Sequence, residues 1–197
     1  CGIGDAYRFP PIALDSRKGD RGRLLVIGGG PFHGAPILSG IAAARSGCDL
    51  VHVAMPSSAM GRAEWPTSLI PEQLPDSDYL TTDSVEAVTG FIDSGRTPDA
   101  LVVGPGLGRD HQTLEAVEKI LEIASFRGIP VVIDADAIAS LPKGTWPESL
   151  VGVATPHQGE YERWLGVATA CEALEGLEGE NQTIVITGPI DELTGPE

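Results

Sequence analysis

The chain has 197 residues, of which 42% are hydrophobic, so it can bury one sizeable core, and no apolar run is long enough for a membrane helix. Its formal net charge of −15 would repel nucleic acid backbones and anionic lipids, so neither nucleic acid nor a membrane is an expected partner. Three widely spaced cysteines without a C-x-x-C pair argue against a zinc site or disulfide framework, and no secretory leader begins the sequence, so a cytoplasmic protein is expected.

The basic residues are mostly of one kind. Ten of the thirteen are arginine and three are lysine. An acidic surface with little lysine is typical of a salt-adapted protein, because high salt screens the repulsion between its charges. The pattern is informative about habitat and says nothing about chemistry.

Strand-like and helix-like stretches alternate along most of the chain. Apolar runs indicate the strands, while helical spacing, a proline in a first turn and a glycine beyond a last turn indicate the helices. In chain order, we expect a strand at 24–28, a helix at 35–47, a strand at 49–55, a helix at 81–95, a strand at 99–104, a helix from Asp110 that ends before Gly128, strands at 130–138 and 150–156, a helix at 160–166 and a strand at 182–188. Strands separated by helices form parallel βαβ units, so the sequence predicts one three-layer α/β/α sandwich with a mainly parallel central sheet.

Five of the expected strands are followed at their carboxyl ends by unusual loops. These loops read GGGPFHGAP, GPGLGRD, DADA, TPHQGE and TGPID. Loops at the carboxyl ends of parallel strands are the usual ligand site of α/β proteins. We therefore expect the five segments to meet in one binding site.

The first of these loops joins a strand to a helix through a cluster of glycines. Such glycines let the backbone approach a ligand, and the helix start favours negative charge, so a phosphate-bearing ligand is the first interpretation. Neither common phosphate loop fits, however. His33 replaces the third glycine of the dinucleotide fingerprint, and Ala35 and Pro36 replace the lysine and hydroxyl residues of a P-loop. A purely structural turn explains the loop equally well.

The next two loops each have two interpretations. Gly104–Gly108 offers backbone amides to a phosphate or a sugar, or serves as a tight strand-to-helix turn, with equal weight. Asp134 and Asp136 would share a face if the strand continued through them, and could then bind Mg²⁺ or a water. An Asx turn or a cap for the following residues is the favoured alternative.

The last two loops carry the remaining polar groups. His157 is a hydrogen-bond donor for a phosphate or substrate hydroxyl, or an ordinary surface histidine at a helix start. Glu160 fits a first-turn helix acid that needs no catalytic role. Thr187 and Gly188 begin an expected hairpin turn or strand exit, where they offer donors to a nucleotide, although a simple loop explains them equally well. His52 alternates within a strand and is expected in the core.

Taken together and in order, five segments resemble the ATP- or ADP-dependent NAD(P)H-hydrate dehydratases, repair enzymes of the ribokinase-like superfamily. The segments are KGDRGRLLVIGGGPFHGAPILSGIAAARSGCDLV, VVGPGLG, PVVIDADAI, ATPHQGEYERWLG and TIVITGPID. The resemblance runs from about Lys18 to the C-terminus and implies a ribokinase-like fold. It also implies that hydrated NADH or NADPH is dehydrated to the normal cofactor with ATP or ADP and Mg²⁺. The nucleotide phosphorylates the hydroxyl on the hydrated nicotinamide ring, and loss of phosphate restores the double bond.

The resemblance also implies where the ligands bind. Ala35, Gly106 and His157 match substrate-binding positions of the family. The family's segment that binds the adenine nucleotide matches Thr187, Gly188, Pro189, Ile190 and Asp191. Thr187 stands where members of the family often have lysine. No metal ligand is assigned in this sequence.

Two further expectations concern the ends of the chain. The family's G-[ST]-G-D segment, which carries its catalytic aspartate, does not occur in this sequence and would lie beyond Glu197, so no catalytic residue is assigned and weak or absent turnover is expected of this chain alone. CGIGDAYRF resembles the tail of an epimerase domain. We therefore expect an N-terminal segment at 1–17 and an incomplete dehydratase domain at 18–197.

Two other functions remain open from the sequence. A ribokinase-like small-molecule kinase would share the fold and the Mg-ATP but transfer phosphate to a stable alcohol. A non-catalytic nucleotide-binding remnant would bind adenine nucleotide or NADPH without turnover. The choice of ATP or ADP, and whether the protein forms a homo-oligomer, also stay open.

Overall fold

The computed structural model describes residue 11 and residues 13–95, 97–166 and 181–195. Most of the expected N-terminal segment 1–17, together with Cys1 and Cys171, lies outside these residues. Among the helices that are described, none is long and apolar enough to cross a membrane.

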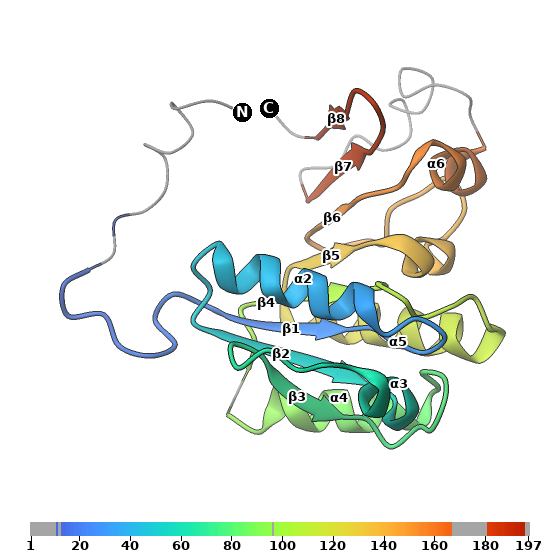
Figure 1. Ribbon diagram of the computed structural model, residues 1–197. Helices are drawn as coiled ribbons and strands as arrows, with labels where there is room; N and C mark the ends of the chain where they lie inside the picture. Colours follow the sequence, from blue (N-terminus) through green and yellow to red (C-terminus); the bar gives the residue numbers. More distant parts are fainter. Residues whose placement is uncertain (1–10, 12, 96, 167–180, 196–197) are drawn as a thin grey trace.

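An eight-stranded sheet forms the middle of the molecule, in the order β3-β2-β1-β4-β5-β6-β7-β8 (Figure 1). Strands β1 to β7 pair in parallel, and β8 pairs antiparallel with β7. The strands are β1 (Arg23–Ile27), β2 (Leu50–Met55), β3 (Ile70–Gln73), β4 (Ala100–Val103), β5 (Val131–Ile133), β6 (Gly152–Ala154), β7 (Gln182–Ile186) and β8 (Glu192–Thr194). The predicted, mainly parallel sheet is confirmed.

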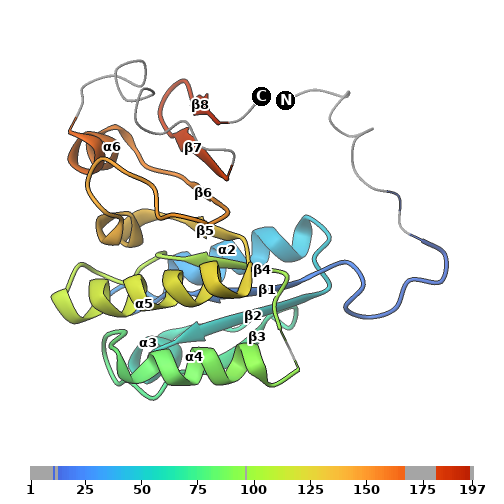
Figure 2. The ribbon, with the colours of Figure 1, turned by 180° about the vertical axis from the view of Figure 1, so that it is seen from behind.

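Helices cover both faces of this sheet. They are α2 (Gly34–Arg45), α3 (Ser57–Arg62), α4 (Asp83–Asp93), α5 (His111–Arg127), the 3₁₀ helix η1 (Ala135–Ser140) and α6 (Gln158–Leu165). Strand β1 shows why two helical layers are needed. Its Val26 packs in a core with Ile37 of α2, whereas Leu25 and Ile27 pack in a larger core with Val117 of α5. Helix α2 lies in front of the sheet in Figure 1, and α4 and α5 lie in front of it in Figure 2. The predicted three-layer sandwich is therefore confirmed.

The predicted ends of the longest helix are confirmed in detail. The Asp110 carboxylate precedes α5 and accepts a hydrogen bond of 3.0 Å from the Gln112 amide. Gly128 follows α5 with φ of 66°, in the left-handed region that glycine adopts at least cost. The cap and the stop were both readable from residue type.

The prediction of one long strand at 130–138 is wrong. Strand β5 ends at Ile133, and Ala135–Ser140 forms a 3₁₀ helix in which Ala135 has φ of 49°. The apolar residues that continue the pattern, Ala137 and Ile138, are buried against helices instead of lying within the sheet. A short apolar run does not by itself distinguish a strand from a helical turn.

Three short elements were not predicted at all. Helix α3 and strand β3 lie in the proline-punctuated section between β2 and α4, and β8 follows the last expected strand. Strand β3 contains Pro71, which is tolerated because β3 lies at the edge of the sheet. Its sequence, IPEQ, carries no strand pattern that stands out from a loop.

Candidate functional site

The order in which the chain adds strands to the sheet changes side between β1 and β4: β2 and β3 lie on one side of β1, and β4 to β8 lie on the other. Strand β1 pairs with β2 on one side and with β4 on the other, and the helices that follow β1 and β4 lie on opposite faces of the sheet. Loops that leave in opposite directions open a crevice at the carboxyl ends of the strands, where ligands of such folds bind. The five unusual loops follow β1, β4, β5, β6 and β7, which are neighbours in the sheet. Their predicted convergence is therefore confirmed. All five lie along the side of the sheet that the carboxyl ends of the strands form, which we call the carboxyl edge.

The two glycine loops form one half of this edge and pack directly against each other. The Gly29 amide donates to the Pro105 carbonyl oxygen at 2.9 Å. Gly106 has φ of +73°, and a Cβ there would overlap the Phe32 carbonyl oxygen. Ala35, in the first turn of α2, is exposed beside this contact. The structure thus brings the predicted substrate residues Ala35 and Gly106 onto touching loops, and the tight turn is required by packing.

The same loop ends at a helix start that is open to an anionic group. His33 occupies the N-cap position of α2, but its side chain makes no capping hydrogen bond to the described residues, and the first turn contains no acidic residue. The guanidinium of Arg62, from α3, donates to the carbonyl oxygen of Gly30. The amino end of a helix and a nearby cation both favour negative charge here. Arg62 was missed from the sequence because α3 was not predicted.

His157 and Thr187 form the other half of the edge. Their backbones make a parallel bridge, and the Thr187 amide donates to the Pro156 carbonyl oxygen at 2.9 Å. Residues 187–191 form the turn between β7 and β8, in which the Gly188 amide donates to Asp191 at 3.1 Å. The expected hairpin turn is confirmed. This turn is exposed beside His157, so the residues predicted to bind the nucleotide lie next to a predicted substrate residue.

The His157 side chain has a defined role in the fold. It caps α6, since its Nδ1 accepts from the Gly159 amide at 3.0 Å, and the Glu160 carboxylate accepts in return from the His157 amide at 3.1 Å. An Nδ1 that accepts a hydrogen bond carries no proton, so a neutral imidazole holds its proton on Nε2. That Nε2 lies 3.4 Å from Glu160 Oε1, and 56% of the side chain is exposed. His157 is therefore both a helix cap and a donor available to a ligand.

The aspartates between the two halves do not share a strand face as expected, because β5 ends before them. Asp134 accepts from the Thr155 hydroxyl at 2.7 Å, and within the described residues its carboxylate makes no capping bond to η1. Asp136 accepts from the Gly108 amide at 2.9 Å and from Nε of Arg109 at 2.9 Å. The expected shared strand face is therefore wrong, and the carboxylates tie neighbouring loops together. Asp134 does occupy the N-cap position of η1, where its backbone carbonyl oxygen accepts from the Ala137 amide at 3.2 Å.

A suitable set of metal ligands is not found in the part of the chain that the structure describes. No three His, Cys, Asp or Glu side chains in that part converge on a point that could hold a metal ion. Asp134 and Asp136 are each occupied by a donor from the protein. These residues do not fit a Mg²⁺ site made by protein side chains alone.

Sequence reasoning missed Arg109, which connects the two halves of the edge. Its guanidinium donates from Nε to Asp136 and from Nη2 to Glu160 Oε1 at 3.1 Å. Glu160 is the first-turn acid of α6 that was expected, and it is also buried. The available signal was an arginine directly after GPGLG, together with acids that follow the next two strands of the sheet, β5 and β6.

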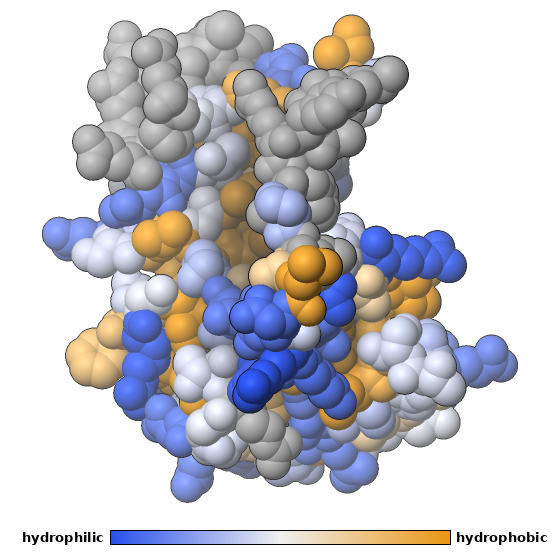
Figure 3. Space-filling model, turned by 90° about the vertical axis from the view of Figure 1, so that its left-hand side faces the viewer, coloured by the Kyte–Doolittle hydropathy of each residue, from blue (hydrophilic) through white to orange (hydrophobic). Residues whose placement is uncertain are grey.

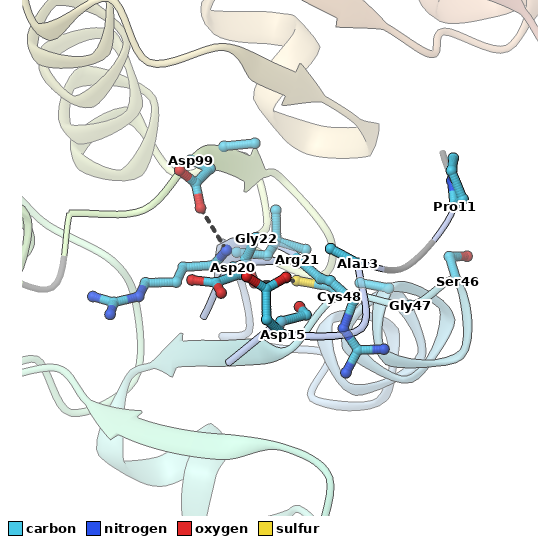
Figure 4. A pocket seen from close by; sticks show the side chains of 15 residues that line it. Pro11, Ala13, Asp15, Asp20, Arg21, Gly22, Ser46, Gly47, Cys48 and Asp99 are labelled. Atoms are coloured by element: carbon cyan, nitrogen blue, oxygen red, sulfur yellow. Dashed lines mark hydrogen bonds between the residues drawn. The ribbon is translucent and has the colours of Figure 1, made fainter. Parts of the chain in front are cut away.

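A cavity of ≈ 700 Å³ lies at the opposite, amino end of the sheet (Figure 4). It is lined by residues from the segment before β1, the end of α2 and the start of β4, among them Asp20, Cys48 and Asp99. Figure 3 views the molecule from this side, where strongly hydrophilic side chains lie among apolar ones. None of the predicted ligand residues contributes to this cavity.

Comparison with known proteins gives a consistent result. Residues 24–188 match the family model described as NAD(P)H-hydrate dehydratase. A bifunctional NAD(P)H-hydrate repair enzyme of Hyperthermus butylicus is 36% identical, over all of this chain and 38% of its own length. An ATP-dependent (S)-NAD(P)H-hydrate dehydratase of Emericella nidulans is 36% identical over 78% of this chain and 44% of its own length. An ADP-dependent enzyme of Cenarchaeum symbiosum is 33% identical over 96% of this chain and 68% of its own length.

Solved structures give the same fold. A protein of Streptococcus mutans described as hypothetical has a TM-score of 0.73 and 27% identity, over 94% of this chain and 66% of its own. An ADP/ATP-dependent NAD(P)H-hydrate dehydratase of Bacillus subtilis, crystallised with ATP/Mg²⁺ and soaked with CoA, has a TM-score of 0.60 and 26% identity, over 93% of this chain and 65% of its own. The chain thus spans less than half of the first two curated relatives and about two thirds of these solved structures.

Proposed function

The chain belongs to the NAD(P)H-hydrate dehydratase family, and we propose from that premise that the protein converts hydrated NADH or NADPH back to the reduced cofactor at the expense of ATP or ADP. The observation that carries the proposal is the arrangement at the carboxyl edge of the sheet. There the paired glycine loops and the His157–Thr187 bridge belong to one row of adjacent strands. A two-ligand reaction needs two adjoining half-sites, and this row supplies them.

The glycine loops are proposed to hold the hydrated dinucleotide. Ala35 is exposed and small, so it leaves room for a ligand against the start of α2. Gly106 lies in the turn that contacts the first loop, where the Phe32 carbonyl oxygen fills the space of a Cβ, so Gly106 offers a ligand only its peptide groups. The uncapped first turn of α2 favours a phosphate of the dinucleotide. His157 is proposed to donate from Nε2 to the same ligand.

The turn from Thr187 to Asp191 is proposed to bind the adenine nucleotide. It is exposed and begins at the residue bridged to His157, so a nucleotide there would adjoin the dinucleotide. In the reaction, the hydroxyl on the hydrated nicotinamide ring accepts a phosphoryl group, and loss of phosphate restores the ring double bond. We propose that Mg²⁺ enters with the nucleotide phosphates, because Mg²⁺ is commonly held by substrate phosphates together with few protein carboxylates.

The proposed function is tested by recovery of reduced-nicotinamide absorbance from hydrated NADPH. The assay uses the full natural protein in high salt, with Mg-ATP and Mg-ADP compared in parallel and with nucleotide omitted as the control. We expect absorbance to return only when nucleotide is present, with phosphate released and no stable phosphorylated product. A stable phosphorylated alcohol would instead identify a small-molecule kinase. Binding of nucleotide with no turnover of hydrated NADPH would identify a non-catalytic remnant.

A further inference from the structure

Arg109 lies where the two halves of the candidate site meet. We propose that Arg109 is a positioning residue: by bridging Asp136 and Glu160, it holds His157 in the orientation that the dinucleotide requires. The inference rests on the proposed function for its ligand. Its structural part concerns only residues of this chain.

The first arm of the bridge fixes the glycine turn. Asp136 accepts from the Gly108 amide and from Nε of Arg109, both at 2.9 Å. Gly108 has φ of +80°, a conformation that leaves its amide free to point away from the following helix α5. The carboxylate therefore anchors the end of GPGLG and the guanidinium of Arg109 at the same point.

The second arm reaches His157 through one carboxylate. Glu160 Oε1 accepts from Nη2 of Arg109 at 3.1 Å and lies 3.4 Å from His157 Nε2. Its other oxygen, Oε2, accepts from the His157 amide at 3.1 Å. The orientation of Glu160 thus sets both the backbone and the ring of His157. Only 10% of the Glu160 side chain is exposed, so few waters could replace the arginine as its partner.

The geometry requires arginine in particular. A planar guanidinium presents donors in two fixed directions and can hold two carboxylates at a set separation. A lysine ammonium keeps the charge but carries no fixed fork, so it would not hold both acids in the same way. Because 43% of the Arg109 side chain is exposed, the bridge contributes modestly to stability, and its expected effect is on the site.

The experiment compares Arg109→Lys and Arg109→Gln with the wild type in the full natural protein. The matched control is Arg127→Gln, which removes an arginine of similar exposure, 41%, from its pair with Asp93 on the surface. Imidazole ¹⁵N NMR reports the surroundings of His157 Nε2, which lies beside Glu160, without ligand or turnover. Steady-state kinetics report the KM for hydrated NADPH and kcat separately.

We expect the wild type and Arg127→Gln to give the same Nε2 resonance for His157, and both Arg109 variants to shift it, because Glu160 lies beside Nε2. The KM for hydrated NADPH should rise about tenfold in both Arg109 variants, the effect of losing one charge-assisted hydrogen bond, with a much smaller change in kcat. Full retention of KM by Arg109→Lys would overturn the positioning role, because charge alone would then suffice. An unchanged Nε2 resonance in both variants would also overturn it. A shifted Nε2 resonance in a protein that never turns over hydrated NADPH would count against the proposed function and leave the positioning of His157 supported.

Discussion

The two ends of the parallel sheet differ in what they offer a ligand. The amino end has a cavity of ≈ 700 Å³, whereas the carboxyl end has glycine loops packed so closely that a Cβ at Gly106 would overlap a backbone oxygen. At the carboxyl end the chain enters helices, so amide groups point outward, and at the amino end helices finish with carbonyl groups outward. An anionic group is therefore favoured at the carboxyl end. The proposed site accordingly rests on the convergence of loops from adjacent strands and not on cavity size.

The largest expected effect comes from adding one methyl group at the crowded end. Gly104 has φ of +128°, and a Cβ there would overlap the Asp134 carbonyl oxygen. We expect Gly104→Ala to lower the free energy of unfolding by more than about 4 kcal/mol, because the backbone that directly follows β5 cannot move away cheaply. The measurement is urea unfolding followed by circular dichroism.

Gly144→Ala is the control for this change. Gly144 also has a positive φ, +72°, but a Cβ there meets no heavy atom of the described residues within 4 Å. Its substitution should cost only the left-handed strain, about 1–2 kcal/mol. If the two variants unfold at the same urea concentration, crowding is not what distinguishes the carboxyl end.

The fold was largely predictable from sequence because it rests on local patterns. Buried runs such as Ala100–Val103 and caps such as Asp110 define parallel strands and helix ends without tertiary information. The convergence of the five loops followed from the topology of βαβ units. The hydrogen bonds of Asp136 could not be predicted, because they depend on where β5 ends and on Arg109, which lies in the loop after β4. Arg62 was lost for a similar reason, since six residues, SSAMGR, give little helical periodicity.

An intermediate effect is expected at the amino end, where Asp49 ties down the segment before β1. Its carboxylate accepts from the Gly19 amide at 3.0 Å, from the Arg21 amide at 3.2 Å and from the Arg21 guanidinium. Asp49→Asn should expose this segment, and trypsin should cleave after Arg17, Lys18 and Arg21 faster than in the wild type. Asp93→Asn, which removes an equal charge elsewhere on the surface, should leave the cleavage rate unchanged. Equal rates in all three proteins would show that Asp49 does not hold the segment.

The same carboxylate predicts a pH dependence. Burial acts to raise the pKa of Asp49, but the amides of Arg21 and Gly19 and the Arg21 guanidinium outweigh it and hold that pKa below its ordinary value of 3.8. A lowered pKa in the folded state stabilises the protein above the unfolded value, and this contribution is lost as pH falls through the lower, folded value. The difference in urea midpoint between wild type and Asp49→Asn should therefore be present at pH 7 and shrink below about pH 4. A difference that is constant with pH would contradict the assignment.

The smallest effect is expected at Cys48, which lines the amino-end cavity. Burial raises the pKa of its thiol, and Sγ donates to the Gly22 carbonyl oxygen at 3.2 Å. In a background with Cys1 and Cys171 replaced by serine, a disulfide reagent should react with Cys48 more slowly than with a free thiol, because less thiolate is present at a given pH. Complete labelling should leave turnover of hydrated NADPH unchanged, since none of the proposed ligand residues lines this cavity. Loss of turnover on labelling would mean that the amino end is coupled to the carboxyl end, and the separation of the two ends into a ligand site and a structural cavity would fail.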